Sequence, residues 1–239
     1  MRVLRRFLFA AALAGLLGAP ALPAQAGDTV RVMTLGDSHT AGIGSTHRAG
    51  YRIAFLKAMA EGGIEVDMVG GKADGPEGFD HRHQGYEGAT TYEVSAAVHD
   101  KMAKYQPDLV VLLIGTNDAR LPSFSPIAFE VHFSVLVDRV FAANPDVKLI
   151  VSTIPPQLYG KNEPANRALN SRIRRHIEGR TNQDQLRIVD IYNLLDDRLD
   201  MSDSMHMNDS GYEKVGGAFA DAALSLLGTD AAGQAQKAP

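Results

Sequence analysis

The sequence predicts an α/β protein, a three-layer α/β/α sandwich around a five-stranded parallel sheet. Three observations lead to this fold class. Short apolar runs alternate along the chain with longer segments whose apolar residues have helical spacing. The run Leu109–Ile114 is apolar at every position, as expected of a parallel strand covered on both faces. The alternation continues to the last helix without an internal repeat or a linker, which indicates a single domain.

Five strands are expected, and each is a short apolar run bounded by turn-forming or polar residues. In chain order they are Val30–Leu35, Ile64–Val69, Asp108–Ile114, Val147–Ile154 and Leu186–Ile191. The first stops at Gly36, the second at Gly70 and the fourth at Pro155. Because a helix separates most consecutive strands, we expect parallel pairing with right-handed crossovers.

Five helices are expected from apolar residues at spacings of three and four. They cover about 51–59, 90–102, 125–144, 164–180 and 208–227. The third begins in the favoured order of Ser125 followed by Pro126, and Asn208 or Asp209 caps the last. The stretch Lys72–Ala89 is polar, rich in glycine and without periodicity, so it is expected to be a long loop of the kind that is usually functional or mobile.

The first 26 residues have the pattern of a secretory signal peptide. Three arginines precede an apolar run over Phe7–Leu17, and an Ala-x-Ala sequence ends at Ala26. The run is shorter than the roughly 20 residues of a membrane span. We therefore expect cleavage after Ala26 and a secreted or periplasmic protein, with an uncleaved anchor as the alternative. What remains is one α/β domain over 27–228 and a small, polar segment over 229–239, expected to be a disordered tail.

Charge and cysteine content exclude several classes of function. The net charge is −4, and because residues 1–26 contribute three arginines and no acid, the remainder carries about −7. Such an acidic protein is a poor partner for nucleic acids and for anionic membrane surfaces. We expect no nucleic-acid partner and no stable membrane insertion after cleavage. The chain has no cysteine, which excludes disulfides, thiol catalysis and thiolate metal sites.

One short segment suggests metal binding. His81 and His83 are two residues apart, but no further histidine or carboxylate cluster has a recognisable metal-ligand spacing. We expect both histidines to be solvated or to support other residues. No metal and no cofactor is predicted.

Polar residues follow the first strand directly. Gly36 permits a sharp turn, and Asp37 and Ser38 place short polar groups just past the strand end. In an open α/β sheet ligands bind at the carboxyl ends of strands, so a serine at this position is placed to act as a nucleophile. Taken alone, Gly-Asp-Ser is also typical of a plain strand-to-helix turn, so the interpretation depends on partners elsewhere in the chain.

A serine hydroxyl needs an adjacent base, and His206 is the best candidate among eight histidines. Asp203 precedes it by three residues, a spacing that lets a carboxylate reach one ring nitrogen while the other points outward. Taken alone, the pair favours a helix-capping Asp203 and a surface His206, because Asp-x-x-His occurs often by chance. The case for catalysis is the combination, since Ser38, Gly88, Asn117 and His206 each follow a predicted strand or precede a helix at the same expected sheet edge.

These residues lie in four blocks that resemble those of the SGNH (GDSL-type) hydrolase superfamily. In family order, the blocks are Gly36-Asp37-Ser38, Gly85-x-x-Gly88, Gly115-Thr116-Asn117-Asp118 and Asp203-x-x-His206. They have family-like spacing and cover nearly the whole chain after residue 26. His39 stands where the name-giving pattern has leucine.

The resemblance implies a flavodoxin-like SGNH hydrolase fold over 27–228 and a role for each block. Ser38 is the implied nucleophile, His206 the general base and Asp203 the residue that orients it. The backbone N–H groups of Ser38 and Gly88 and the side-chain amide of Asn117 form the implied oxyanion hole. We further expect substrate contacts from four neighbouring residues: Asp37, His39, Tyr86 and Asp118.

The stretch from residue 66 to 88 resembles secreted carbohydrate esterases of the acetylxylan-esterase kind. The matching segments are Met68-Val69-Gly70, Gly75-Pro76, Phe79-Asp80 and His83-Gln84-Gly85-Tyr86-Glu87-Gly88. This implies metal-independent hydrolysis of small or polymeric carbohydrate esters, with removal of acetyl groups through an acyl-Ser38 intermediate. Activity is expected to rise as His206 loses its proton.

Two alternatives remain open at this point. The first is a lysophospholipase, arylesterase or thioesterase of the same superfamily, acting on longer acyl chains. The second is a non-catalytic glycan-binding module. The chain has no tryptophan, a common sugar-stacking residue, so tyrosine or phenylalanine side chains must take that role if the substrate is a carbohydrate.

Overall fold

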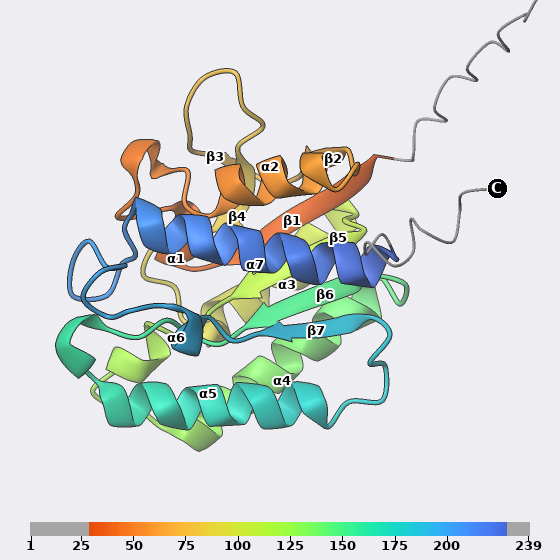
Figure 1. The fold of residues 1–239 in the computed structure, drawn as a ribbon. Helices are drawn as coiled ribbons and strands as arrows, with labels where there is room; N and C mark the ends of the chain where they lie inside the picture. Colours follow the sequence, from red (N-terminus) through yellow and green to blue (C-terminus); the bar gives the residue numbers. More distant parts are fainter. Residues whose placement is uncertain (1–28, 229–239) are drawn as a thin grey trace, which may run out of the picture.

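One sheet forms the middle layer of the protein. The computed structural model describes residues 29–228, so the predicted signal peptide over 1–26 and the predicted tail over 229–239 lie outside the described residues. Within residues 29–228, seven strands form the sheet in the order β3-β4-β1-β5-β6-β7, with β2 also paired to β1 (Figure 1).

The five predicted strands are confirmed. They are β1 (Val30–Gly36), β2 (Val66–Met68), β5 (Leu109–Leu113), β6 (Lys148–Ser152) and β7 (Leu186–Val189). β1 pairs in parallel with β2 and β5, β5 with β6, and β6 with β7. The ends of β1, β5, β6 and β7 therefore lie at one side of the sheet, which we call the carboxyl edge.

The segment Lys72–Ala89, expected to be a loop, contains two further strands. β3 (Lys72–Ala73) and β4 (Arg82–Gly85) pair antiparallel, and β4 runs parallel to β1. The prediction of five strands is therefore wrong in number. β4 buries His83 and Gln84, which are held by hydrogen bonds, so it lacks the apolar periodicity that marks the other strands.

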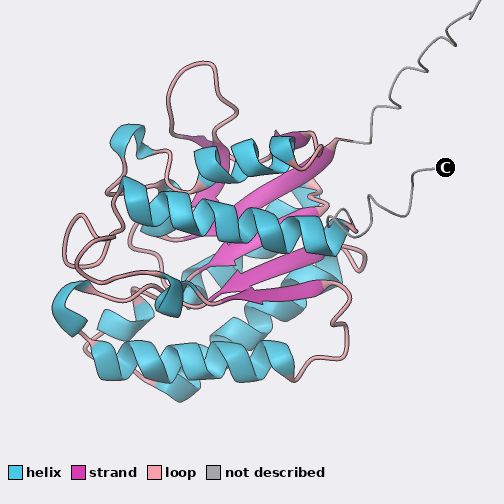
Figure 2. Ribbon diagram, in the orientation of Figure 1, coloured by secondary structure: helices cyan, strands magenta, loops and turns pink. Residues whose placement is uncertain are grey.

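Helices cover both faces of the sheet, which confirms the predicted three-layer sandwich (Figures 1 and 2). One face carries α2 (Arg52–Glu61) and α7 (Asp209–Leu227), and the other carries α3 (Thr91–Tyr105), α4 (Pro126–Ala143) and α5 (Glu163–Glu178). All five overlap the predicted helices.

The fully buried β5 separates two apolar cores. Leu109, Val111 and Leu113 belong to the core beneath α2 and α7. Val110 and Leu112 belong to the core beneath α3, α4 and α5. Successive side chains of a strand point to opposite faces, so a strand that is apolar at every position fits the middle of a three-layer fold.

Short helical segments follow the strands at the carboxyl edge. They are α1 (Ser38–Ala41), η1 (Thr46–Arg48), η2 (Asp118–Arg120), η3 (Leu158–Gly160) and α6 (Ile191–Leu194). Loops and helix starts at this edge carry the side chains that the sequence predicts to be functional.

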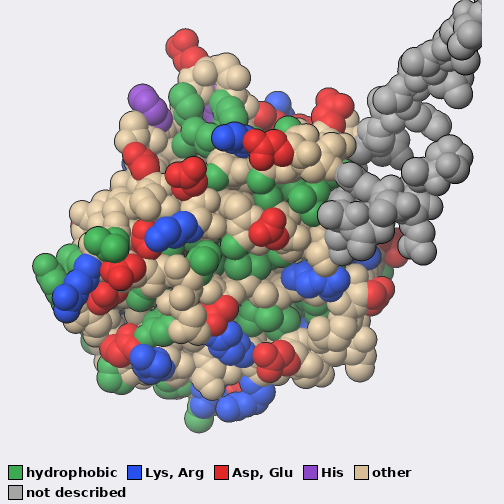
Figure 3. Space-filling model, in the orientation of Figure 1, with side chains coloured by type: hydrophobic (Ala, Val, Ile, Leu, Met, Phe, Trp, Pro, Cys, Tyr) green, Lys and Arg blue, Asp and Glu red, His purple; other side chains and the backbone are tan. Residues whose placement is uncertain are grey.

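The described surface over α2 and α7 carries charged side chains of both signs (Figure 3). Figure 3 shows acidic and basic side chains interspersed across this face. No helix within residues 29–228 has the length and apolar character needed to span a membrane.

Candidate active site

Ser38 is presented by a turn that only glycine permits. A Cβ atom at Gly36 would lie 1.9 Å from the carbonyl oxygen of Leu113 on the neighbouring β5. After this close approach, Asp37 caps α1 by accepting a hydrogen bond from the backbone N–H of His39, at 3.0 Å. Ser38 is the first residue of α1, so its side chain stands at the carboxyl edge.

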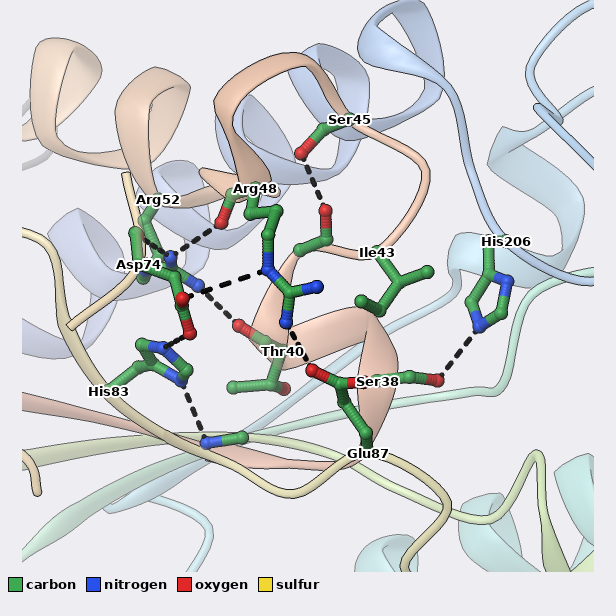
Figure 4. Close-up of polar contacts among 12 residues, drawn as sticks. Ser38, Thr40, Ile43, Ser45, Arg48, Arg52, Asp74, His83, Glu87 and His206 are labelled. Atoms are coloured by element: carbon green, nitrogen blue, oxygen red, sulfur yellow. Dashed lines mark hydrogen bonds and ion pairs between the residues drawn. The ribbon is translucent and has the colours of Figure 1, made fainter. Parts of the chain in front are cut away.

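Ser38, His206 and Asp203 form a continuous chain of hydrogen bonds. His206 Nε2 lies 3.0 Å from Ser38 Oγ, and His206 Nδ1 lies 2.7 Å from Asp203 Oδ2 (Figure 4 shows the first contact). A carboxylate can only accept hydrogen bonds, so the ring proton is on Nδ1, and the Nδ1–H group donates a hydrogen bond to Asp203. Nε2 is then free to accept the Ser38 hydroxyl proton, which is the arrangement that general-base activation requires.

The loop that carries His206 is shaped by Asp203 itself. Asp203 Oδ1 accepts the backbone N–H groups of Met205 and His206, both at 2.8 Å, while Oδ2 holds the imidazole. Partial burial raises the pKa of Asp203, but these hydrogen bonds outweigh it and keep the pKa below its ordinary value. Asn208, not Asp203, caps α7, so the alternative reading of Asp203 as a helix cap is wrong.

The glycine and asparagine blocks meet beside Ser38. Asn117 follows β5, and its Nδ2 donates to the carbonyl of Ala89, the residue after Gly88, at 2.9 Å. Gly88 has a φ of 76°, which favours glycine, and its backbone is exposed. Within the described part of the chain, the N–H groups of Ser38 and Gly88 donate to no backbone carbonyl. Both remain available to a ligand.

A model of the GDSL-like lipase/acylhydrolase family matches residues 34–214, which include all four blocks. The chain belongs to this family. The resemblance identified from the blocks is thereby confirmed, and the family is one of carboxylic-ester hydrolases.

Relatives of this GDSL-like hydrolase include several esterases. A multidomain esterase of Ruminococcus flavefaciens is 28% identical over 230 residues, covering 83% of this chain and 29% of that protein. The chain thus spans less than a third of that relative's length. A family 3 carbohydrate esterase of Clostridium thermocellum superposes with a TM-score of 0.71 at 26% identity, covering 81% of this chain and 94% of that one. An acetyl esterase variant with acetate ion gives 0.68 at 25% identity, covering 83% and 98%.

Two of the predicted substrate contacts lie beneath the site. Asp37 and His39 are fully buried, so the prediction that they contact substrate is wrong. Burial raises the pKa of Asp37 to about 7 and lowers the pKa of His39 to about 3, so His39 is neutral. Its ring lies 5.5 Å from that of His206, centroid to centroid. Asp37 thus caps the helix that begins at Ser38, and His39 packs near the His206 ring.

The other two predicted contacts differ from each other. Asp118 is almost fully buried and accepts hydrogen bonds from the N–H and hydroxyl of Thr91, at 2.9 and 3.0 Å. It anchors the start of α3 and is as exposed as Ser38, so its contact with substrate stays a prediction. Tyr86 is half-buried and lines a cavity of about 340 Å³ beside Gly88, so it remains a candidate.

His83, one of the two histidines considered as metal ligands, has other partners. His83 is buried, with Nε2 3.1 Å from Asp74 and Nδ1 accepting the N–H of Gly85 at 3.0 Å. Burial is the main cause that lowers the pKa of His83 to about 4. Among residues 29–228, no group of three or more histidine or acidic side chains is placed to hold a metal ion.

Sequence reasoning missed a group of charged residues beside Ser38. The buried Arg52 donates to the carbonyl of Thr40 in α1, and Arg48 contacts Glu87 next to Gly88. The only available signal was an arginine beside Tyr51, at the start of the apolar stripe of α2.

Removal of the Asn117 amide is expected to slow turnover without unfolding the protein. Loss of one oxyanion donor typically costs about 10²–10³ in kcat, so Asn117→Ala is expected to fall in this range for an acetate ester. Asn144→Ala is the matched control, because Asn144 Nδ2 also donates to a backbone carbonyl, that of Pro107 at 3.2 Å, far from Ser38 in the fold. A kcat for Asn117→Ala within about threefold of the wild-type value would show that Asn117 is not part of the oxyanion hole.

Proposed function

We propose that the protein is an exported serine esterase that removes acetyl groups from carbohydrates. The observation that carries this proposal is the position of His206, which contacts both Ser38 Oγ and Asp203. A non-catalytic glycan-binding module has no need for this arrangement. The acetyl and carbohydrate parts are supported by the similarity of the chain to a family 3 carbohydrate esterase and to an acetyl esterase.

The proposed reaction has two half-reactions. Ser38 Oγ attacks the acyl carbon while its proton passes to His206 Nε2, and the carbonyl oxygen becomes an oxyanion held by the N–H groups of Ser38 and Gly88 and the amide of Asn117. The C–O bond to the alcohol breaks, the alcohol takes the proton from His206, and Ser38 keeps the acetyl group. Water then gives a proton to His206 and attacks the acetyl ester, the bond to Ser38 Oγ breaks as Ser38 takes the proton back from His206, and acetic acid departs.

Asp203 contributes to both half-reactions. Its carboxylate fixes the ring proton on Nδ1 and stabilises the imidazolium that forms twice in each cycle. The lowered pKa of Asp203 keeps it ionised through the neutral range, so it accepts the hydrogen bond from His206 Nδ1 throughout that range.

The acyl preference is tested with para-nitrophenyl acetate and octanoate, and with acetylated xylan as the carbohydrate substrate. We expect the acetate ester to have a kcat/KM at least about 10-fold above the octanoate ester, and free acetate to be released from the xylan. Faster octanoate hydrolysis would assign the protein to the long-acyl alternative. No hydrolysis of any ester would leave the glycan-binding alternative and overturn the proposal.

Export is the second part of the proposal. It is supported by the basic start, the apolar run over Phe7–Leu17 and the Ala-x-Ala sequence ending at Ala26. N-terminal sequencing of protein recovered outside the cytoplasm is expected to begin at Gly27. Recovery of the chain only from the cytoplasm, with its first 26 residues intact, would contradict export.

A further inference from the structure

Two consecutive residues beside the nucleophile have a backbone conformation that side chains disfavour. His47 and Arg48 have φ values of 62° and 55°, in the left-handed region that favours glycine. Such strain persists only where surrounding contacts impose it, and it occurs preferentially at functional sites. Here Thr46 donates from both its N–H and its hydroxyl to the carboxylate of Asp209, at 2.7 and 2.6 Å, which fixes the loop to the start of α7.

The backbone of Arg48 is also fixed to the helix that carries Ser38. Its carbonyl oxygen packs so closely on Gly42, at the end of α1, that a Cβ atom there would lie 2.3 Å away. The Arg52 guanidinium joins the two segments, because it donates to the carbonyl of Arg48 at 3.0 Å and to that of Thr40 within α1 (Figure 4). The strained loop therefore holds Arg48 at a set position relative to Ser38.

From this position, the Arg48 side chain reaches the segment that carries Gly88. Its Nη2 donates to Glu87, the residue immediately before Gly88, and its Nε lies 3.6 Å from Asp74 (Figure 4). Asp74 in turn accepts from His83 Nε2, and His83 Nδ1 accepts the N–H of Gly85. Both ends of the turn from Gly85 to Gly88 are thus connected to Arg48.

The contact with Glu87 matters because of the peptide group that follows it. The N–H of Gly88 belongs to the peptide between Glu87 and Gly88, so its direction depends on how Glu87 is held. Gly88 itself offers little restraint, since even an added Cβ would meet no atom within 4 Å. The hydrogen bonds from Ala89 N–H to Tyr86 and from Asn117 to the Ala89 carbonyl hold the residue after Gly88, not the peptide before it.

We propose that Arg48 is a positioning residue for the oxyanion hole, which holds Glu87 so that the N–H of Gly88 faces the carbonyl under attack by Ser38. This role rests on the proposed esterase function and adds to it a residue outside the four blocks. Arg48 does not touch the reacting atoms, and its effect passes through Glu87.

The solvent exposure of the Arg48 and Glu87 side chains allows a positioning role to be distinguished from a purely structural one. The side chains of Arg48 and Glu87 are 44% and 51% exposed, and an ion pair this open to solvent adds little to folding stability. If the pair were only structural, its loss would leave turnover unchanged. If it positions the Gly88 N–H, turnover falls while the melting temperature and KM stay nearly constant, because the hole acts on the transition state.

The test compares four variants of the full chain: Arg48→Met, Glu87→Gln, the double variant and Arg48→Lys. With para-nitrophenyl acetate we expect kcat to fall about 10-fold in each of the first two, less than for complete loss of a donor, with KM within about twofold. The double variant is expected to be no slower than either single variant, because the two residues act as one pair. Arg48→Lys is expected to recover part of the loss.

Arg82→Met is the matched control, since Arg82 lies in β4 and makes a similarly exposed ion pair, with Asp80 at 3.7 Å. Its kcat is expected to be that of wild type. Unchanged kcat in Arg48→Met, or losses that multiply in the double variant, would overturn the role of Arg48 while an active wild type keeps the proposed function. A wild type inactive on every ester would overturn both.

Discussion

Ser38→Ala is expected to lower kcat for acetate ester hydrolysis by roughly 10⁴-fold or more, because comparable serine hydrolases lose that much or more without their nucleophile. The substitution removes the oxygen that lies 3.0 Å from His206 Nε2 and leaves no group in its place to form the acyl ester. The fold is expected to be unaffected, since the only side-chain hydrogen bond of Ser38 Oγ among the described residues is that with His206. Steady-state kinetics and a thermal melt measure the two effects separately.

Ser95→Ala is a suitable control for this change. Ser95 is buried to nearly the same degree as Ser38, at 4% against 6% exposed, but lies in α3 away from the carboxyl edge. Its turnover is expected to match wild type. A Ser38→Ala variant that keeps near-wild-type turnover would show that another group forms the acyl intermediate.

His206→Ala is expected to cause a loss of similar size, because the serine hydroxyl is a weak nucleophile without its base. The two residues act as a unit, so the Ser38/His206 double variant is expected to be no slower than either single variant. Asp203→Asn is expected to cost less, up to about 10⁴-fold, since the Asp203 side chain is half exposed and water can partly replace it.

The kcat of the Ser38/His206 double variant tests whether the two residues act as a unit. His132→Ala serves as the control, because His132 is half-buried against Tyr92 and lies in α4. Losses that multiply in the Ser38/His206 double variant would mean that the two side chains act independently. Such a result would contradict the hydrogen-bonded chain from Asp203 to Ser38.

The parts of the fold that depend on apolar periodicity were accessible from the sequence. β5 was predicted because burial on both faces requires apolar residues throughout, and β1 because a short apolar run ends at Gly36. α3 and α4 were predicted because their caps and apolar stripes are local features. The candidate triad was accessible for a related reason. Ser38 follows the end of β1, and Asp203 and His206 precede α7, so the alternating strands and helices bring all three to one edge of the sheet.

The features that could not be predicted from the sequence depend on polar contacts between segments that are far apart in the chain. β4 is buried through the hydrogen bonds of His83 and Gln84, which no periodicity reveals. The sequence likewise does not reveal whether a side chain next to a motif points toward the site or into the core. Asp37 and His39 were expected at the substrate, whereas packing buries both side chains fully, and Asp37 caps α1. The contact of Arg48 with Glu87 joins residues 39 positions apart and has no local signal.

The central claim is that His206 activates Ser38 as the group that receives the acyl chain. The most direct measurement is to treat the folded chain with a fluorophosphonate, which forms a stable adduct on an activated serine, and to map the adduct by mass spectrometry. The account predicts one adduct per chain, on Ser38, at a rate that collapses in His206→Ala. An adduct on another residue, or none on a chain that hydrolyses esters, would contradict it.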